Sequence, residues 1–284
     1  MEERQRLPEF LKRGIIDCEE TKKVRKLLNN LNLNTVCDEA RCPNKAECYK
    51  KNSATFMIMG KFCTRNCRFC AIQTGKPEEL DKNEPLNIAK AIKELNLKYA
   101  VITSVTRDDL PDFGAEHFKQ TIEEIKKLNP NVKIEVLTPD FKNNDECIKR
   151  VAETPLDVFN HNIETTRVLH KTIRPQADYD RSLSVLYKSK KFNPKLKTKT
   201  GLMVGLGETI DDIKEIFKDL VKIECDIMTI GQYIQPTKNH VKVVRYYEEA
   251  EYKELEKIAK EIGIKYTFFA PLARSSYRAA EVFE

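Results

Sequence analysis

The sequence has no stretch that approaches the roughly 18 consecutive apolar residues of a membrane-spanning helix. It also has no low-complexity tract, no linker rich in glycine and serine, and no strict internal repeat. Hydrophobic residues make up 40% of the 284 residues and charged residues 33%, which excludes a wholly disordered chain. This length allows one large or two small domains, and a single α/β barrel also fits it.

An excess of either charge is missing as well. The chain has 50 Lys and Arg residues against 44 Asp and Glu residues, so its formal net charge is +6, and no long block carries one sign. A surplus this small does not indicate a nucleic-acid partner. We expect no nucleic-acid and no membrane partner, and a mild preference for acidic partners.

Several catalytic motifs are absent. The four histidines form no H-x-x-H or H-E-x-x-H pattern, and the chain has no P-loop, no recognisable Ser-His-Asp arrangement and no tryptophan. The first ten residues, MEERQRLPEF, are charged where a secretion signal needs an apolar stretch. We therefore expect a cytoplasmic protein, kept in a reducing compartment where disulfides are rare.

Cysteine is the residue present in excess. Six of the nine cysteines fall between residues 37 and 70. In a reducing cytosol, thiols clustered in this way usually bind metal. Cys18, Cys147 and Cys225 match no ligand spacing, and we interpret Cys147 and Cys225 as small buried apolar residues.

The middle of the chain alternates short β-branched runs with helical patterns, which favours parallel βαβ units. The expected strands are 55–59, 99–103, 132–137, 157–160, 198–204 and 226–230. The expected helices between them are 86–97, 115–128, 143–152, 178–191 and 210–222. Right-handed crossovers would curl these units into an open or partial (β/α)6 barrel.

Three regions follow from this pattern. Residues 1–54, with a helix near 19–31, form an N-terminal extension, residues 55–235 form the barrel, and residues 236–284 form a C-terminal extension. The last region has an expected helix over 248–262, a strand over 264–269 and a polar tail. Polar or Gly/Pro-rich turns follow five of the expected strands, and in such folds function gathers at this end of the strands. These turns are TSVTRDD (103–109), TPD (138–140), NHNIETT (160–166), GLGE (205–208) and QYIQP (232–236).

One cysteine motif follows the first expected barrel strand directly. Cys63, Cys67 and Cys70 form a C-x3-C-x2-C run, whose three thiolates can each hold one iron of a 4Fe–4S cluster. The fourth iron then lacks a protein ligand, and an open metal site is where chemistry occurs. Zinc is the alternative, but closed zinc sites need four N or S ligands and no nearby histidine completes the set.

A second incomplete triad lies upstream. Cys37, Cys42 and Cys48 form a C-x4-C-x5-C run, again with no obvious fourth ligand. Two incomplete triads 15 residues apart, from Cys48 to Cys63, indicate two clusters.

The downstream motif resembles the signature of the radical S-adenosylmethionine (SAM) superfamily. This resemblance implies that the open iron binds the amino and carboxylate groups of SAM, which is then cleaved to methionine and a 5′-deoxyadenosyl radical. With the upstream motif CDEARCPN, the chain more narrowly resembles the lipoyl synthase family. Further matching runs are ATFMI (54–58), VITSVTRDDLPDFGAEHF (101–118), DVFNHNIETT (157–166), RPQADYDRSL (174–183), TKTGLMVGLGET (198–209), GQYIQPT (231–237) and RSSYRA (274–279).

The family resemblance implies roles for particular residues. Cys63, Cys67 and Cys70 would hold the SAM-binding cluster, and Cys37, Cys42, Cys48 and Ser275 an auxiliary 4Fe–4S cluster. A serine oxygen is a hard ligand on iron and leaves more easily than a thiolate, which suits a cluster that is dismantled. The expected SAM contacts lie in or after strand-end loops, and they are Ser104, Thr106, Asn162, Glu164 and Arg174.

The implied activity is that of a sulfurtransferase that inserts sulfur at C6 and C8 of an octanoyl chain attached to a carrier lysine. Those carbons carry unactivated C–H bonds, which a side-chain base cannot ionise. The implied carriers are lipoyl-carrier domains, namely the glycine cleavage H protein and the E2 subunits of 2-oxoacid dehydrogenases. A ferredoxin or flavodoxin-type reductant and an iron–sulfur carrier protein are also implied.

Two other classes remain open. One is another sulfur-inserting radical SAM enzyme, similar to biotin synthase or to a methylthiotransferase, although the upstream triad with RSSY disfavours it. The other is a two-cluster electron carrier or a zinc-stabilised binding protein. Electron carriers are usually small and have complete four-cysteine sets.

Overall fold

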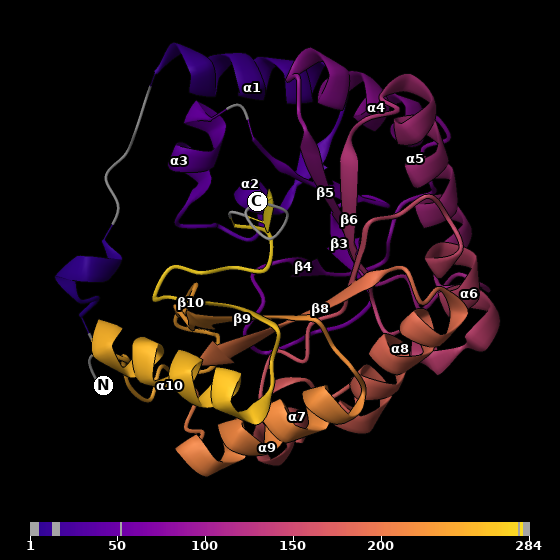
Figure 1. The fold of residues 1–284 in the computed structure, drawn as a ribbon. Coiled ribbons are helices and arrows are strands. Elements are labelled where there is room, and N and C mark those ends of the chain that lie inside the picture. Colours follow the sequence, from indigo (N-terminus) through magenta and orange to yellow (C-terminus); the bar gives the residue numbers. More distant parts are fainter. Residues whose placement is uncertain (1–5, 13–17, 52, 278, 281–284) are drawn as a thin grey trace.

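The computed structural model describes residues 6–12, 18–51, 53–277 and 279–280. Residues 1–5, on which the expectation about a secretion signal partly rests, and residues 281–284 of the expected polar tail lie outside them. The centre of the fold is an eight-stranded sheet in the order β1-β2-β5-β6-β7-β8-β9-β10. Every neighbouring pair is parallel except β1 with β2. Figure 1 shows the helices α4 to α10 around the outside of this curved sheet.

All six expected barrel strands are present, and β10 extends the sheet beyond them. The strands are β1 Asn34–Thr35, β2 Thr55–Ile58, β5 Tyr99–Ser104, β6 Lys133–Leu137, β7 Val158–Asn160, β8 Lys197–Val204, β9 Ile227–Gln232 and β10 Tyr266–Phe269. The helices are α1 Glu19–Asn30, α2 Val36–Glu39, α3 Lys45–Lys50, α4 Glu84–Glu94, α5 Ala115–Leu128, α6 Asp145–Ala152, α7 Arg167–Ile173, α8 Tyr179–Phe192, α9 Ile210–Lys222 and α10 Glu249–Ile262. The expected α/β partial barrel is therefore confirmed, with α7 as an additional helix.

Helix boundaries follow from local capping chemistry. At the start of α9, the Thr209 hydroxyl accepts a hydrogen bond from the amide of Asp212, and the Asp212 carboxylate accepts one from the amide of Thr209. Asn144 caps α6 in a similar way by accepting from the amide of Cys147. Because α6 begins after this cap, it is two residues shorter at its start than the expected helix 143–152.

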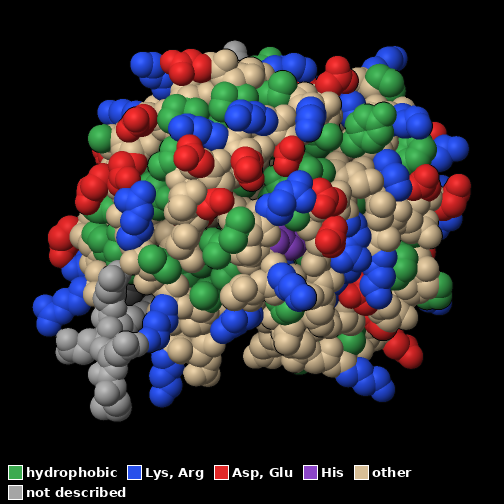
Figure 2. Space-filling view, turned by 90° about the horizontal axis from the view of Figure 1, so that it is seen from below, with side chains coloured by type: hydrophobic (Ala, Val, Ile, Leu, Met, Phe, Trp, Pro, Cys, Tyr) green, Lys and Arg blue, Asp and Glu red, His purple; other side chains and the backbone are tan. Residues whose placement is uncertain are grey.

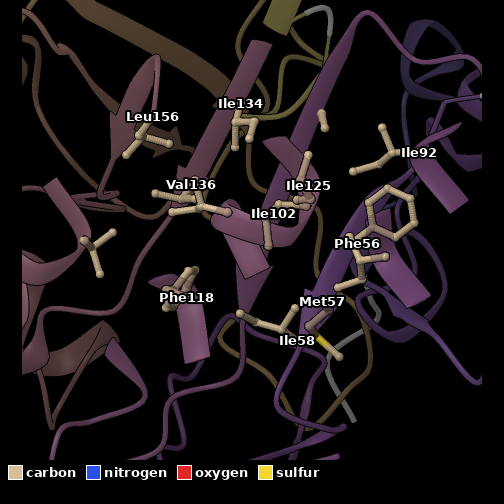
Figure 3. Close-up of a cluster of buried hydrophobic side chains, with 14 of the residues drawn as sticks. Phe56, Met57, Ile58, Ile92, Ile102, Phe118, Ile125, Ile134, Val136 and Leu156 are labelled. Carbon is tan, nitrogen blue, oxygen red and sulfur yellow. The ribbon is translucent and has the colours of Figure 1, made fainter. Parts of the chain in front are cut away.

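The two faces of the sheet differ in polarity. Ile134 and Val136 of β6 belong to the apolar core under the outer helices, together with Phe118 of α5 (Figure 3). Glu135, between them, points to the other face, where its carboxylate accepts a hydrogen bond from Nζ of Lys199 at 2.9 Å. The outer layer is thus held by apolar burial, and the inner face of the partial barrel carries buried polar groups.

The surface carries charges of both signs. On the face drawn in Figure 2, Lys and Arg side chains are interspersed with Asp and Glu. This mixture agrees with the formal net charge of +6 in a chain with 50 basic and 44 acidic residues. Among the described residues, no helix is both long enough and apolar enough to cross a membrane.

The burial of His170 in α7 predicts a specific sensitivity to acid. Burial, assisted by the charge of Arg174, lowers the pKa of His170 from 6.5 to about 4. The unfolded chain binds a proton below about pH 6.5, but the folded chain binds it only near pH 4. Stability is therefore lost as the pH falls through this window, by about 2 kcal/mol between pH 7 and pH 5 for this one group.

We expect the His170→Leu variant to lack the loss of about 2 kcal/mol in unfolding free energy that His170 causes between pH 7 and pH 5, because leucine is apolar and does not titrate. Urea unfolding of both proteins at the two pH values measures it. An equal loss of unfolding free energy in the variant and the parent would contradict the prediction.

Candidate active site with two cysteine triads

The loop that carries the downstream triad is closed by a small sheet of its own. Strand β3 (Phe62–Cys63) pairs in parallel with β4 (Gln73–Thr74), and the amide of Gly75 donates to the carbonyl of Cys63. The loop thus leaves the end of β2 and returns upon itself, which brings Cys67 and Cys70 back beside Cys63. Besides burial, the nearness of Cys67 and Cys63 raises the pKa of the Cys70 thiol, as expected of neighbouring sulfurs.

The environment of these three thiols fits an iron cluster. The Sγ atom of Cys63 accepts hydrogen bonds from the backbone amides of Arg65 at 3.4 Å and Thr106 at 3.3 Å. Burial raises the pKa of Cys67, and it raises the pKa of Cys70 to about 12. A thiol of this kind stays protonated until a metal replaces the proton, and amide donors to sulfur are a feature that tunes iron–sulfur clusters.

Among the described residues, no three His, Cys, Asp or Glu side chains are arranged around a single metal ion.

The upstream triad is formed by two short helices and the turn between them. Cys37 lies in α2 and Cys48 in α3, and the amide of Cys42 donates to the carbonyl of Cys37 at 3.2 Å. Burial, with the nearby Cys42 as a further cause, raises the pKa of Cys37 to about 12 and that of Cys48 to about 11. Cys37 is buried and Cys42 and Cys48 are half-buried, so the three thiols lie close together at the edge of the core.

The C-terminal segment packs directly against this upstream triad. The side-chain amide of Asn44 donates to the carbonyl of Leu272 at 2.8 Å, and the hydroxyl of Tyr277 donates to the carboxylate of Glu47 at 3.0 Å. Residues expected to form a polar tail are thus partly buried. Ser275 lies between these two contacts along the chain, beside the side chain of Asn162, which donates to its Oγ at 2.9 Å.

Three of the expected SAM contacts come together between the two triads. Asn162 Nδ2 also donates to Glu164 Oε1 at 3.0 Å, and Arg174 Nη1 donates to the carbonyls of Asn162 and Ile163. Arg174 additionally approaches the thiol of Cys67. Burial raises the pKa of Glu164, an effect that the positive charge of Arg174 opposes.

The remaining two expected SAM contacts lie at the end of β5. Ser104 is the last residue of that strand, and Thr106 reaches Cys63 through its backbone amide. Some buried polar atoms around this region have no partner within the described part of the chain, namely Ser104 Oγ, His161 Nε2, Asn162 Oδ1 and Arg174 Nε. Buried polar groups are normally hydrogen-bonded, and the amino, carboxylate and ribose groups of SAM offer the complementary donors and acceptors.

Sequence reasoning missed a group of charged residues beneath the downstream triad. Arg65, inside the motif itself, forms ion pairs with Asp108 and Asp140, which follow β5 and β6. The signal was available, because both carboxylates lie in the polar turns TSVTRDD and TPD. What the sequence did not show is that one arginine joins them.

A close approach at Gly231 in β9 supports the position of Ser275. A Cβ atom at Gly231 would lie 2.0 Å from the carbonyl oxygen of Ala273, two residues before Ser275. Gly231→Ala must therefore displace the C-terminal segment, at a cost of about 1 to 3 kcal/mol in stability. We expect urea unfolding to show this loss of unfolding free energy in the variant. An unchanged unfolding free energy would contradict the close approach at Gly231.

Comparisons with known proteins agree with this geometry. The sequence model of the radical SAM superfamily matches residues 57–220, and that of the N-terminal domain of lipoyl synthase matches residues 1–42. Two relatives, both described as lipoyl synthase, are from Caldicellulosiruptor saccharolyticus (52% identity) and Caldanaerobacter subterraneus subsp. tengcongensis (51% identity). Each alignment covers 96% of this chain and 96% of the relative.

Solved structures show the same fold at low identity. HydG, a maturase of the [FeFe]-hydrogenase, superimposes with a TM-score of 0.60 and 14% identity over 92% of this chain and 69% of its own. Streptococcus suis SuiB bound to S-adenosylmethionine gives 0.59 and 13%, over 80% of this chain and 53% of its own. These neighbours establish the fold, and the match over nearly the full length of the two relatives is more specific. The chain therefore belongs to the lipoyl synthase family of the radical SAM superfamily.

Proposed function

We propose that this chain, a sulfurtransferase by family, inserts two sulfur atoms at C6 and C8 of a protein-bound octanoyl-lysine and so produces lipoyl-lysine. The observation that carries the proposal is that Asn162 and Glu164 connect the surroundings of the two incomplete cysteine triads. Arg174, next to both residues, approaches Cys67, and Arg274 is close to both Glu164 and Cys42. Asn162 also donates to Oγ of Ser275, the residue after Arg274. One reacting chain held there would be within reach of both sites.

The family takes SAM and 4Fe–4S clusters as cofactors, and the residues present fit them. Cys63, Cys67 and Cys70 would hold the SAM-binding cluster. The sulfur donor would be held by Cys37, Cys42, Cys48 and Ser275. When bound, the two clusters would supply the electron that splits SAM into methionine and a 5′-deoxyadenosyl radical and the sulfur atoms that are inserted into the substrate.

The chain's own residues bind, orient and exclude water. Arg174 would pair with the SAM carboxylate, and Glu164 would accept from its amino or ribose groups. Ser104, Thr106 and Asn162 complete the proposed contacts at the strand ends. A buried site of this kind protects a reactive radical from side reactions, which is the protein's main task where a cofactor carries the chemistry.

The proposed organisation keeps the three regions 1–54, 55–235 and 236–284, with the middle one as the radical-forming barrel. The family implies a lipoyl-carrier protein as substrate. As finer assignments we propose the H protein and E2 carrier domains, a ferredoxin or flavodoxin-type reductant, an iron–sulfur carrier that rebuilds the donor, and a cytoplasmic location. The formal charge of +6 suits an acidic carrier domain.

The second candidate is another sulfur-inserting radical SAM enzyme, similar to biotin synthase or to a methylthiotransferase. The packing of Leu272 on Asn44 and of Tyr277 on Glu47, near the upstream triad, supports the first candidate, because Ser275 in that segment would complete a four-ligand set.

The decisive experiment incubates the reconstituted protein anaerobically with SAM, reductant and an octanoyl-lysine peptide, followed by mass spectrometry. We expect a product with two added sulfur atoms, and about eight iron and eight sulfide ions per chain before turnover, as two 4Fe–4S clusters require. A peptide with a single methylthio group would support the second candidate. About one zinc and no sulfide would refute both.

A further inference from the structure

The side chain of Arg65 connects the loop of the downstream triad to two strand ends. Its Nε and Nη2 atoms donate to the two carboxylate oxygens of Asp108 at 2.7 and 2.9 Å. Its Nη1 and Nη2 atoms donate to those of Asp140 at 2.9 and 2.7 Å. One guanidinium therefore makes a bidentate pair with each of two carboxylates, from the loops after β5 and β6.

These ion pairs are buried, so they hold one geometry. The Arg65 side chain is 4% exposed and that of Asp140 is fully buried. Arg181 approaches Asp140 from α8 at 3.1 Å and Lys142 approaches Asp108 at 4.0 Å, so three positive and two negative side chains meet in this cluster. Although burial opposes it, the hydrogen bonds from Arg65 hold the pKa of Asp140 below its usual range. Bidentate pairs are the strongest and most directional of protein ion pairs, and a lysine cannot reproduce them.

The backbone of the same residue supports the sulfur ligands. The amide of Arg65 donates to Sγ of Cys63, and its carbonyl accepts a hydrogen bond from the hydroxyl of Thr74, at the other end of the loop. Thr64 connects the loop to the residues after β5 as well, since its amide and hydroxyl both donate to the carbonyl of Thr106. The side-chain cluster thus fixes the peptide that lies between Cys63 and Cys67.

We propose that Arg65 is a positioning residue that clamps the downstream cysteine loop onto the ends of β5 and β6 through Asp108 and Asp140. The clamp sets where the sulfurs of Cys63 and Cys67 stand relative to Thr106, and it keeps an amide directed at the Cys63 sulfur. Arg65 has this role only if Cys63, Cys67 and Cys70 hold the SAM-binding cluster, as proposed above.

The same loop provides a matched control. Asp109, next to Asp108, forms its own bidentate pair with Arg107, whose Nε and Nη2 atoms donate to it at 3.0 and 2.9 Å. That pair does not include Arg65. Asp108→Asn weakens the clamp and leaves both neighbouring arginines in place, whereas Asp109→Asn removes a comparable charge one residue away.

The test uses the full chain with Cys37, Cys42 and Cys48 replaced by alanine, so that only the downstream cluster is reconstituted. We expect Asp108→Asn to assemble the same amount of iron as the parent. A chelator should then remove the iron about tenfold faster, the effect typical of weakened support around a metal ligand. The reduction potential of Asp108→Asn should be more negative than that of Asp109→Asn, which loses the same charge, because a less firmly held amide stabilises the reduced cluster less well.

Further variants complete the series. Arg65→Lys should fall between the parent and Arg65→Met in the rate of iron release, and Asp109→Asn should match the parent in rate and potential. Equal release rates and potentials for Asp108→Asn and Asp109→Asn would overturn the proposal. A lower melting temperature of Asp108→Asn without either change would also overturn it. The iron content of the parent protein tests the cluster assignment separately.

Discussion

Alanine in place of Cys63, Cys67 or Cys70 is expected to abolish the cleavage of SAM by the reduced protein. Each change would remove one of the three proposed thiol ligands of a cluster whose fourth iron is left without a protein ligand. Loss of groups that merely support a metal ligand costs 10- to 100-fold, so we expect loss of a ligand itself to exceed about 100-fold. Anaerobic incubation with dithionite and SAM, with 5′-deoxyadenosine quantified by chromatography, measures the effect.

Cys147→Ala is the matched control for these variants. Cys147 is buried in α6, as expected, and lies far along the chain from both triads. Cys225, which lies between α9 and β9, is also buried and far along the chain from both triads. Removal of the Cys147 thiol should leave SAM cleavage unchanged. Cleavage that persists in all three triad variants would contradict the assignment of the SAM-binding cluster.

Ser275→Ala should separate the two halves of the reaction. If Ser275 is the fourth ligand of the sulfur donor, its loss leaves the downstream triad intact but the donor one ligand short. We expect 5′-deoxyadenosine to form at a rate within about twofold of the parent, while lipoyl product falls by more than about 100-fold, the same scale as for the loss of other ligands. Mass spectrometry of the peptide and chromatography of the nucleoside, taken from one reaction mixture, provide both values.

The neighbouring serine is the control for this result. Ser276→Ala removes the same hydroxyl one residue later, and the contact from Asn162 is made to Ser275 rather than to Ser276. Full sulfur insertion by the Ser276 variant together with its loss in the Ser275 variant supports the assignment. The reverse pattern would transfer the ligand role to Ser276, and normal product from both variants would exclude a serine ligand.

Much of the fold was predictable because parallel strands buried on both sides have a strong local signature. The nearly continuous apolar run at 55–59 identifies β2 without any tertiary information. The helix α7 was missed because it follows the polar run NHNIETT and is only seven residues long. Its formation depends on burial of His170 and Ile173 rather than on a periodic pattern.

The site was predictable only in part, for a physical reason. Thiol spacing within one loop is a local property, so the sequence indicates both cysteine triads. The contact between Asn162 and Ser275 joins residues 113 positions apart, and that between Arg65 and Asp140 joins residues 75 apart. Such pairings depend on the register of the strands that carry them, which spacing along the chain does not encode.

The contacts of Asn44 with Leu272 and of Glu47 with Tyr277 span 228 and 230 residues of the chain. On the ribosome, the barrel strands up to β9 and all three cysteines of the downstream triad are synthesised before Leu272. The proposed sulfur-donor site is therefore the last part of the molecule to be completed during translation. A chain interrupted between β10 and Leu272 would have the proposed radical-forming site but an incomplete proposed sulfur-donor site, so under this proposal the intact C-terminal segment is required for productive use of SAM.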